Sequence, residues 1–164
     1  MLQKKVCMLG TFAVGKTSLV RRFVESIYSD EYHTTIGVKI DKKVIRANER
    51  EVTLVLWDIY GRDDFQSLQM DYLRGMSGYL LVADGTRRQT VEEAVSIFHQ
   101  VEKVFAKVPF IFLLNKADLK DEWEVGADTA KQIGERDWTI MHSSAKTGQA
   151  VEEAFEELGR KMLS

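Results

Sequence analysis

The residues best suited to chemistry near the start of the chain form the run GTFAVGKT at positions 10–17, which matches the pattern G-x-x-x-x-G-K-[ST]. Gly10 and Gly15 allow a tight backbone turn, so that the loop amides and the N-terminus of the following helix face anionic phosphate oxygens. Lys16 adds a positive charge, and the hydroxyl of Thr17 is a ligand for Mg²⁺. We predict a phosphate-binding loop; the alternative is a strand-to-helix turn that happens to be rich in glycine. The predicted nucleotide contacts are Gly10, Phe12, Ala13, Val14, Gly15, Lys16, Thr17 and Ser18.

A second run, DIYG at positions 58–61, places a carboxylate after apolar residues and a glycine three positions later. On its own this pattern is weak, because a capping or turn aspartate explains it equally well. Beside a phosphate loop, Asp58 is suited to hold Mg²⁺ through water. Gly61 would let a backbone N–H approach the γ-phosphate.

The run NKAD at positions 115–118 directly follows an apolar segment and selects the base. An ionised Asp118 is only an acceptor, which matches the N1–H and N2–H₂ donors of guanine, whereas adenine presents an acceptor at N1. Lys116 can lay its stem on the base plane, and Asn115 can tie neighbouring loops together. A fourth run, SSAK at positions 143–146, can offer a backbone N–H to guanine O6.

The elements that must position these runs alternate between apolar strand patterns and helical stripes, which is typical of an α/β fold. We predict a six-stranded, mostly parallel sheet with five helices on both faces. The strands are expected near residues 6–9, 39–47, 52–56, 78–83, 110–114 and 138–142, and helical stripes occupy 19–27, 91–105 and 151–158. Residues 39–56 suggest a hairpin. In such a sheet, ligands bind at the carboxyl ends of the strands, where the four runs lie.

Composition limits the function classes. The 164 residues match one domain, residues 1–164, and the net charge of −2 with interspersed signs argues against nucleic acid as a partner. No segment approaches the about 20 apolar residues of a spanning helix. The single cysteine, Cys7, lies in an apolar run, so we expect a buried thiol and a cytoplasmic setting. We expect no lipid anchor and membrane association only peripherally, through partners.

The four runs have the order and spacing found in Ras-like small GTPases, and the chain resembles that family over essentially its whole length. The segments TTIGV at 34–38, WD at 57–58 and YLRG at 72–75 are most similar to the Rab branch. The resemblance implies a P-loop NTPase G domain that binds GTP or GDP with Mg²⁺, hydrolyses GTP and acts as a monomeric switch. Effector and regulator proteins would bind through switch regions near residues 32–37 and 61–72.

The resemblance also assigns roles to individual positions. Tyr28 sits where the family places an aromatic residue against guanine, although a core residue at the helix end is an alternative. The expected metal ligands are Thr17, Thr35 and Asp58, and the catalytic group comprises Lys16, Thr35, Gly61 and Arg62. The expected base contacts are Asn115, Lys116, Asp118, Ser144, Ala145 and Lys146, and Thr35 and Gly61 complete the nucleotide contacts.

Three departures from the family pattern concern the phosphate end. The loop carries Phe12 and Ala13 where small residues are usual, Tyr60 replaces an alanine, and Arg62 replaces the glutamine that orients the attacking water. We expect binding to survive and intrinsic hydrolysis to be low. The alternatives are a docking module that holds GTP with negligible turnover, an Arg62 that acts as an arginine finger in cis and, less consistent with Asp118, a phosphotransferase acting on a small molecule.

Overall fold

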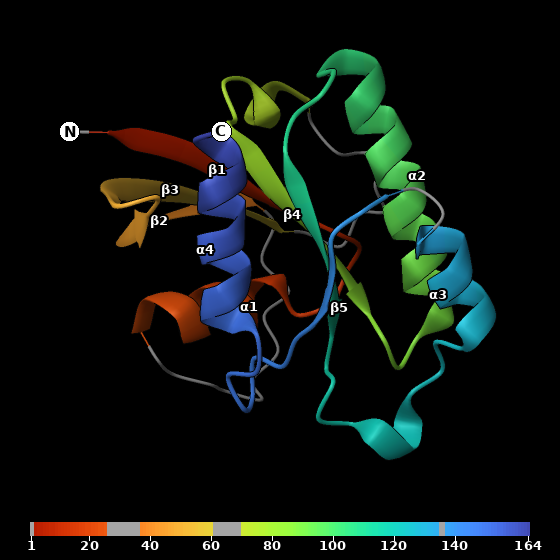
Figure 1. The fold of residues 1–164 in the computed structure, drawn as a ribbon. Coiled ribbons are helices and arrows are strands. Elements are labelled where there is room, and N and C mark those ends of the chain that lie inside the picture. Colours follow the sequence, from red (N-terminus) through yellow and green to blue (C-terminus); the bar gives the residue numbers. More distant parts are fainter. Residues whose placement is uncertain (1, 26–36, 61–69, 135–136) are drawn as a thin grey trace.

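The structure, a computed structural model, describes residues 2–25, 37–60, 70–134 and 137–164. Its strands form one six-stranded sheet with the order β2-β3-β1-β4-β5-β6 (Figure 1). Only β2 is antiparallel to its neighbour, and all other strand pairs are parallel, as predicted. The bounds are Gln3–Leu9 for β1, Gly37–Ala47 for β2, Arg50–Tyr60 for β3, Gly78–Asp84 for β4, Phe110–Asn115 for β5 and Ile140–His142 for β6.

Helices cover both faces of this sheet. Helices α1 (Lys16–Glu25) and α4 (Val151–Met162) lie on one face, and α2 (Arg88–Val104) and α3 (Ala127–Gly134) lie on the other (Figure 1). Two short 3₁₀ helices, η2 (Met70–Leu73) and η3 (Lys120–Glu122), complete the helices of the described segments. None of the described helices is long and apolar enough to cross a membrane.

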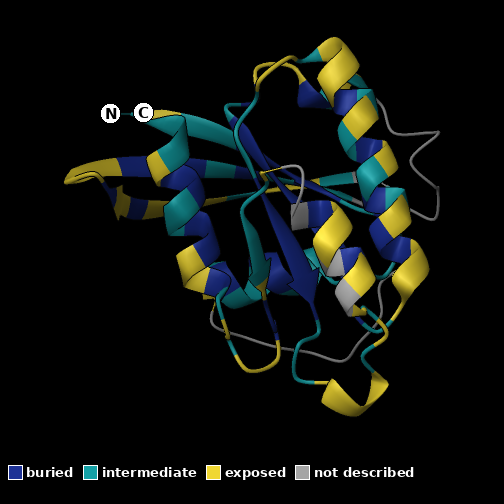
Figure 2. Ribbon diagram, turned by 45° about the vertical axis from the view of Figure 1, so that its right-hand side comes forward, coloured by how far each residue is buried: buried dark blue, intermediate teal, exposed yellow. Residues whose placement is uncertain are grey.

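Successive side chains of the central strands point to opposite faces of the sheet, so the core has two layers. Val6 and Met8 of β1 pack with α1 and α4, whereas Cys7 and Leu9 pack with α2. All seven residues of β4 are buried, because helices cover both faces of a parallel strand in this position. Figure 2 shows the buried strands between helices whose outer sides are exposed. The thiol of Cys7 is buried as predicted, and burial raises its pKa to about 12.

The predicted hairpin joins β2 to β3 through a turn at Asn48 and Glu49, whose φ angles are +49° and +63°. Two consecutive positive φ values are the pattern of a two-residue type I′ turn, which matches the twist of the flanking strands. The hairpin brings β3 alongside β1 with Asp58 opposite Met8. Asp58 therefore reaches the edge of the sheet at which the phosphate loop begins.

Two elements differ from the sequence prediction. The strand expected at 138–142 begins at Ile140, because Trp138 packs its ring against those of Phe98, Phe110 and Phe112. Helix α3 has no counterpart among the helical stripes, since its eight residues are too few to establish a periodic pattern.

Candidate functional site

The phosphate loop leaves β1 at Gly10 and enters α1 at Lys16, and the two glycines of its G-x-x-x-x-G-K-[ST] pattern have no room for a side chain. Gly10 has a φ of +152°, and a Cβ there would meet the carbonyl oxygen of Val82. Gly15 has a φ of +104°, and a Cβ there would meet the side-chain amide of Asn115. Close packing against neighbouring strands therefore requires glycine at both positions.

Three side chains donate hydrogen bonds to backbone carbonyl oxygens of this loop. Nζ of Lys16 donates to Gly10 O over 2.7 Å, and Nζ of Lys116 donates to Ala13 O over 3.1 Å. The amide of Asn115 donates to Val14 O over 2.9 Å. Burial lowers the pKa of Lys16 to about 8, and the nearby charge of Asp58 opposes that shift. An anion beside Lys16 would offset the cost of burying its ammonium group.

The hydroxyl of Thr17 and the carboxylate of Asp58, two predicted metal ligands, are hydrogen-bonded to each other. Thr17 Oγ1 donates to Asp58 Oδ2 over 2.6 Å, and Asp58 is only 1% exposed. Its other oxygen, Oδ1, is buried without a hydrogen-bond partner among the described residues. Burial raises the pKa of Asp58, against the opposing effects of the Thr17 hydroxyl and the Lys16 charge.

This donor set fits Mg²⁺, which binds oxygen ligands and takes one or two carboxylates together with substrate phosphates and water. The unpartnered Oδ1 of Asp58 is the observation that favours a cation here. The described part of the chain holds no cluster of three or more His, Cys, Asp or Glu side chains that could hold a metal without such phosphates.

The loops after β5 and β6 are joined by their own side chains. Ser144 Oγ donates to Asp118 Oδ1 over 2.7 Å, and Ser143 Oγ donates to Asn115 Oδ1 over 3.1 Å. The backbone N–H of Ala117 donates to Ser143 O over 2.9 Å. Because the amide of Asn115 also donates to Val14 O, this one buried side chain links the loops after β5 and β6 to the phosphate loop.

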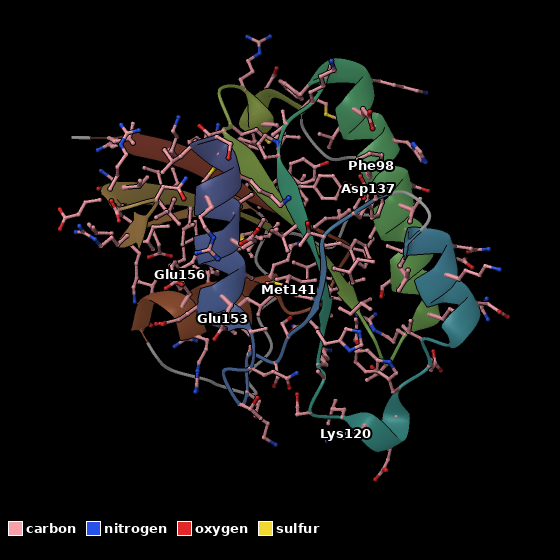
Figure 3. All side chains as sticks on the ribbon, in the orientation of Figure 1. Phe98, Lys120, Asp137, Met141, Glu153 and Glu156 are labelled. Atoms are coloured by element: carbon pink, nitrogen blue, oxygen red, sulfur yellow. The ribbon has the colours of Figure 1, made fainter. Side chains whose placement is uncertain are left out.

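The SSAK loop is fixed from a second side by α1. Arg22 donates to the carbonyl oxygens of Lys146 and Thr147 over 3.4 and 3.2 Å. The N–H of Thr147 donates to Ser144 Oγ over 3.1 Å, so Ser144 is held while it contacts Asp118. Figure 3 labels Lys120, the first residue of η3, which follows the NKAD run after Leu119.

Comparison with known proteins agrees with this geometry. The family model described as "Ras family" matches residues 5–164. The chain belongs to the Ras family. It is 34% identical over 163 residues to Ras-related protein Rab-4A of Bos taurus, covering 98% of this chain and 74% of the relative. It is 33% identical over 161 residues to Ras-related protein Rab-2B of Dictyostelium discoideum, covering 97% and 80%. It is also 31% identical over 161 residues to Ras-related protein Rab-1 of Theileria parva, covering 96% and 73%.

These relatives place this small GTPase with the Rab branch. The structure of this Ras-family chain brings together the phosphate loop, Asp58, the NKAD run and the SSAK run. Helix α1 contains Ser18, which is partly buried, and Ala145 is 4% exposed. Four further predicted site residues lie outside the described residues, together with most of both predicted switch segments: Tyr28, Thr35, Gly61 and Arg62.

The structure adds polar residues that the motifs of this small GTPase do not include. Asp84 ends β4 fully buried, and its Oδ2 lies 2.9 Å from Nζ of Lys116. Its signal in the sequence is a carboxylate directly after a continuous apolar strand, as Asn115 is an amide directly after β5. Arg22 offers no such signal, because a basic residue on a helix is ordinarily a solvated one.

Proposed function

We propose that this chain is a guanine-nucleotide switch, which binds GTP or GDP with Mg²⁺, hydrolyses GTP slowly and signals through nucleotide-dependent switch regions. The observation that carries the proposal is the joined pair of base loops, in which Ser144 fixes the carboxylate of Asp118 beside the phosphate loop. A fixed, acceptor-only carboxylate selects guanine over adenine.

In this proposal, Asp118 accepts from N1–H and N2–H₂ of guanine, and the stem of Lys116 lies along the base plane. The backbone of Ser144, Ala145 and Lys146 supplies an N–H for O6. Each hydrogen bond to a charged acceptor contributes about 1.5–3 kcal/mol. The two bonds to Asp118 therefore account for most of the discrimination against ATP.

At the phosphate end, the loop amides and Lys16 neutralise the phosphates, and Thr17 and Asp58 hold the metal. The bound Mg²⁺ supplies electrostatic stabilisation of charge on the transferring phosphoryl group. Thr35 and Gly61 are proposed to contact the γ-phosphate side only when that group is present, which gives the differential contact that a switch requires.

Hydrolysis is proposed to be slow because Arg62 stands where the family usually has glutamine. Orienting a water molecule for attack benefits from an acceptor for its proton, and a guanidinium offers donors only. Phe12 adds bulk within the phosphate loop. Arg62 acting as a finger in cis predicts the opposite mutant behaviour and remains the competing account of this position.

The second candidate function is a docking module that holds GTP with negligible turnover, and the same departures at Phe12 and Arg62 favour it. Quantifying the nucleotide that co-purifies with the protein, and then following GTP in a single turnover, separates the two functions. A switch converts bound GTP to GDP over minutes to hours, as expected for an intrinsic rate of about 10⁻⁴ s⁻¹. GTP that persists unchanged throughout such an assay would make the docking module the better account.

Hydrogen exchange tests the conformational part of the proposal. Residues 32–37 and 61–72 are expected to gain protection with a non-hydrolysable GTP analogue relative to GDP. Equal protection in the two nucleotide states would contradict the switch, even if both nucleotides bind tightly. Partners are expected to be effector and regulator proteins that recognise these segments, with the protein itself acting as a monomer in the cytoplasm.

A further inference from the structure

Arg87, which lies outside the four runs described above, connects the end of β4 to the phosphate loop. Its Nε donates to Asp84 Oδ2 over 2.9 Å, and its Nη2 donates to Phe12 O over 3.0 Å. The two ends of one rigid guanidinium therefore hold a buried carboxylate and a loop carbonyl at a fixed separation.

Arg87 completes a series along the phosphate loop. Three consecutive carbonyl groups are each held by a side chain from a neighbouring strand end: Phe12 O by Arg87, Ala13 O by Lys116 and Val14 O by Asn115. In a planar trans peptide, the C=O of one residue and the N–H of the next point in opposite directions. Holding the Phe12 carbonyl therefore fixes the direction of the Ala13 N–H, which is turned away from Arg87.

Asp84 is itself held in place by hydrogen bonds, so it can fix the position of Arg87. The carboxylate is fully buried, and its Oδ1 accepts from the N–H and the hydroxyl of Thr86 over 2.9 and 2.6 Å. Its own N–H donates to Thr90 Oγ1 over 2.8 Å. Burial acts to raise the pKa of Asp84, but the hydrogen bonds from Thr86, Lys116 and Arg87 outweigh it, so the pKa lies below its usual range. Asp84 thus stays ionised and keeps both cations in place.

We propose that Arg87 is a positioning residue for the phosphates of the bound guanine nucleotide, acting through the peptide between Phe12 and Ala13. The inference rests on the proposed function, since it assumes that this loop binds nucleotide phosphates. Arg87 does for the first peptide of the series what the two motif residues Lys116 and Asn115 do for the next two.

Removing the guanidinium leaves the surrounding fold supported. Asp84 keeps its bonds from Thr86 and Lys116, and the Arg87 side chain is 44% exposed. Arg87 and Phe12 line a surface hollow of about 480 Å³, so water can occupy the vacated space. Arg88 is the matched control, because its exposed side chain makes no hydrogen bond or ion pair with the rest of the described chain.

The test compares Arg87→Met with Arg88→Met in the Mg²⁺-loaded protein, using two ligands. GDP dissociation is followed with a fluorescent analogue, and guanosine, which has no phosphate, is titrated by NMR. We expect Arg87→Met to release GDP about fivefold faster than wild type while its affinity for guanosine stays within about twofold, as for loss of one bond near the surface. Arg88→Met is expected to match wild type with both ligands. Arg87→Gln carries the same expectation in direction and replaces Arg87→Met if the latter does not fold.

The outcomes separate the inference from the function on which it rests. GDP release from Arg87→Met at the rate of Arg88→Met would overturn the role of Arg87. Equal weakening of GDP and guanosine would also overturn it, because a general loosening of the site does not distinguish phosphate from base. A wild-type protein that binds ADP as tightly as GDP would instead overturn the proposed function, whatever the Arg87 variants do.

Discussion

The two ends of the candidate site are built differently. At the base end, polar side chains pair with one another, as Ser144 does with Asp118 and Ser143 with Asn115. At the phosphate end, the paired groups are mostly loop carbonyls, and the carboxylate of Asp58 keeps one buried oxygen without a partner in the described residues. Pairs of side chains within the protein thus position the base end, whereas the phosphate end keeps a buried carboxylate oxygen that a ligand would satisfy.

The departures from the family follow the same division. The residues that differ, Phe12, Ala13, Tyr60 and Arg62, all belong to the phosphate end, and the NKAD and SSAK runs match the family. In this chain, the departures thus concern the handling of the terminal phosphate and leave the predicted base contacts as the family has them. Tight binding combined with slow hydrolysis is the behaviour that such a division predicts.

The largest expected effect is at the phosphate end, from Lys16→Ala. Losing hydrogen bonds from a charged donor to the β- and γ-phosphates should weaken binding of a non-hydrolysable GTP analogue by about 10²–10⁴-fold, at about 1.5–3 kcal/mol for each bond. Equilibrium competition against the labelled analogue measures the loss, and Lys103→Ala, on the exposed side of α2, is the control. A loss of less than tenfold would mean that the loop does not hold the phosphates through Lys16.

A variant that changes the hydrolysis rate but not the nucleotide affinity would support the division between the base end and the phosphate end. Arg62→Gln, combined with Phe12→Gly, should accelerate single-turnover GTP hydrolysis by about tenfold or more, because a glutamine can both accept from and donate to the attacking water. GDP affinity should stay within a few-fold of wild type. Slower turnover in Arg62→Gln alone, at unchanged affinity, would identify Arg62 as catalytic.

The smallest expected effect is at the base end, from Ser144→Ala. The change removes the donor to Asp118 and the acceptor for the N–H of Thr147, and it leaves the backbone of the loop held by Arg22. GDP affinity should therefore fall by about fivefold, the value of the one hydrogen bond to the base-binding carboxylate. Ser96→Ala, at an exposed position of α2, controls for loss of a hydroxyl. Wild-type affinity in Ser144→Ala would show that the carboxylate of Asp118 is positioned without this contact.

The sequence was sufficient to predict six strands, a mostly parallel sheet and the motif residues, because apolar strands and glycine patterns depend on local spacing. Asn115 and Asp118 follow directly from such a pattern. Asp84 has a signal in the sequence, because it is a carboxylate at the end of a continuous apolar strand. Arg87 and Arg22 were not predictable as site residues, since their importance depends on which loop the fold brings opposite them. Arg87 and Phe12 are separated by 75 positions, and no local pattern indicates that contact.

The most direct test of the account is to substitute Asp118 and measure which nucleotide base the protein then prefers. Wild-type protein is expected to bind GDP at least about 10²-fold more tightly than ADP. Asp118→Asn is expected to lose affinity for GDP and to gain affinity for xanthosine diphosphate. The reason is that the Asn amide donates to O2 of xanthine, whereas the Asp carboxylate accepts from N2–H₂ of guanine. Competition among GDP, ADP and xanthosine diphosphate for both proteins measures all of these affinities. Equal binding of GDP and ADP by the wild type, or an Asp118→Asn variant with unchanged base preference, would contradict the account of this chain as a guanine-nucleotide switch.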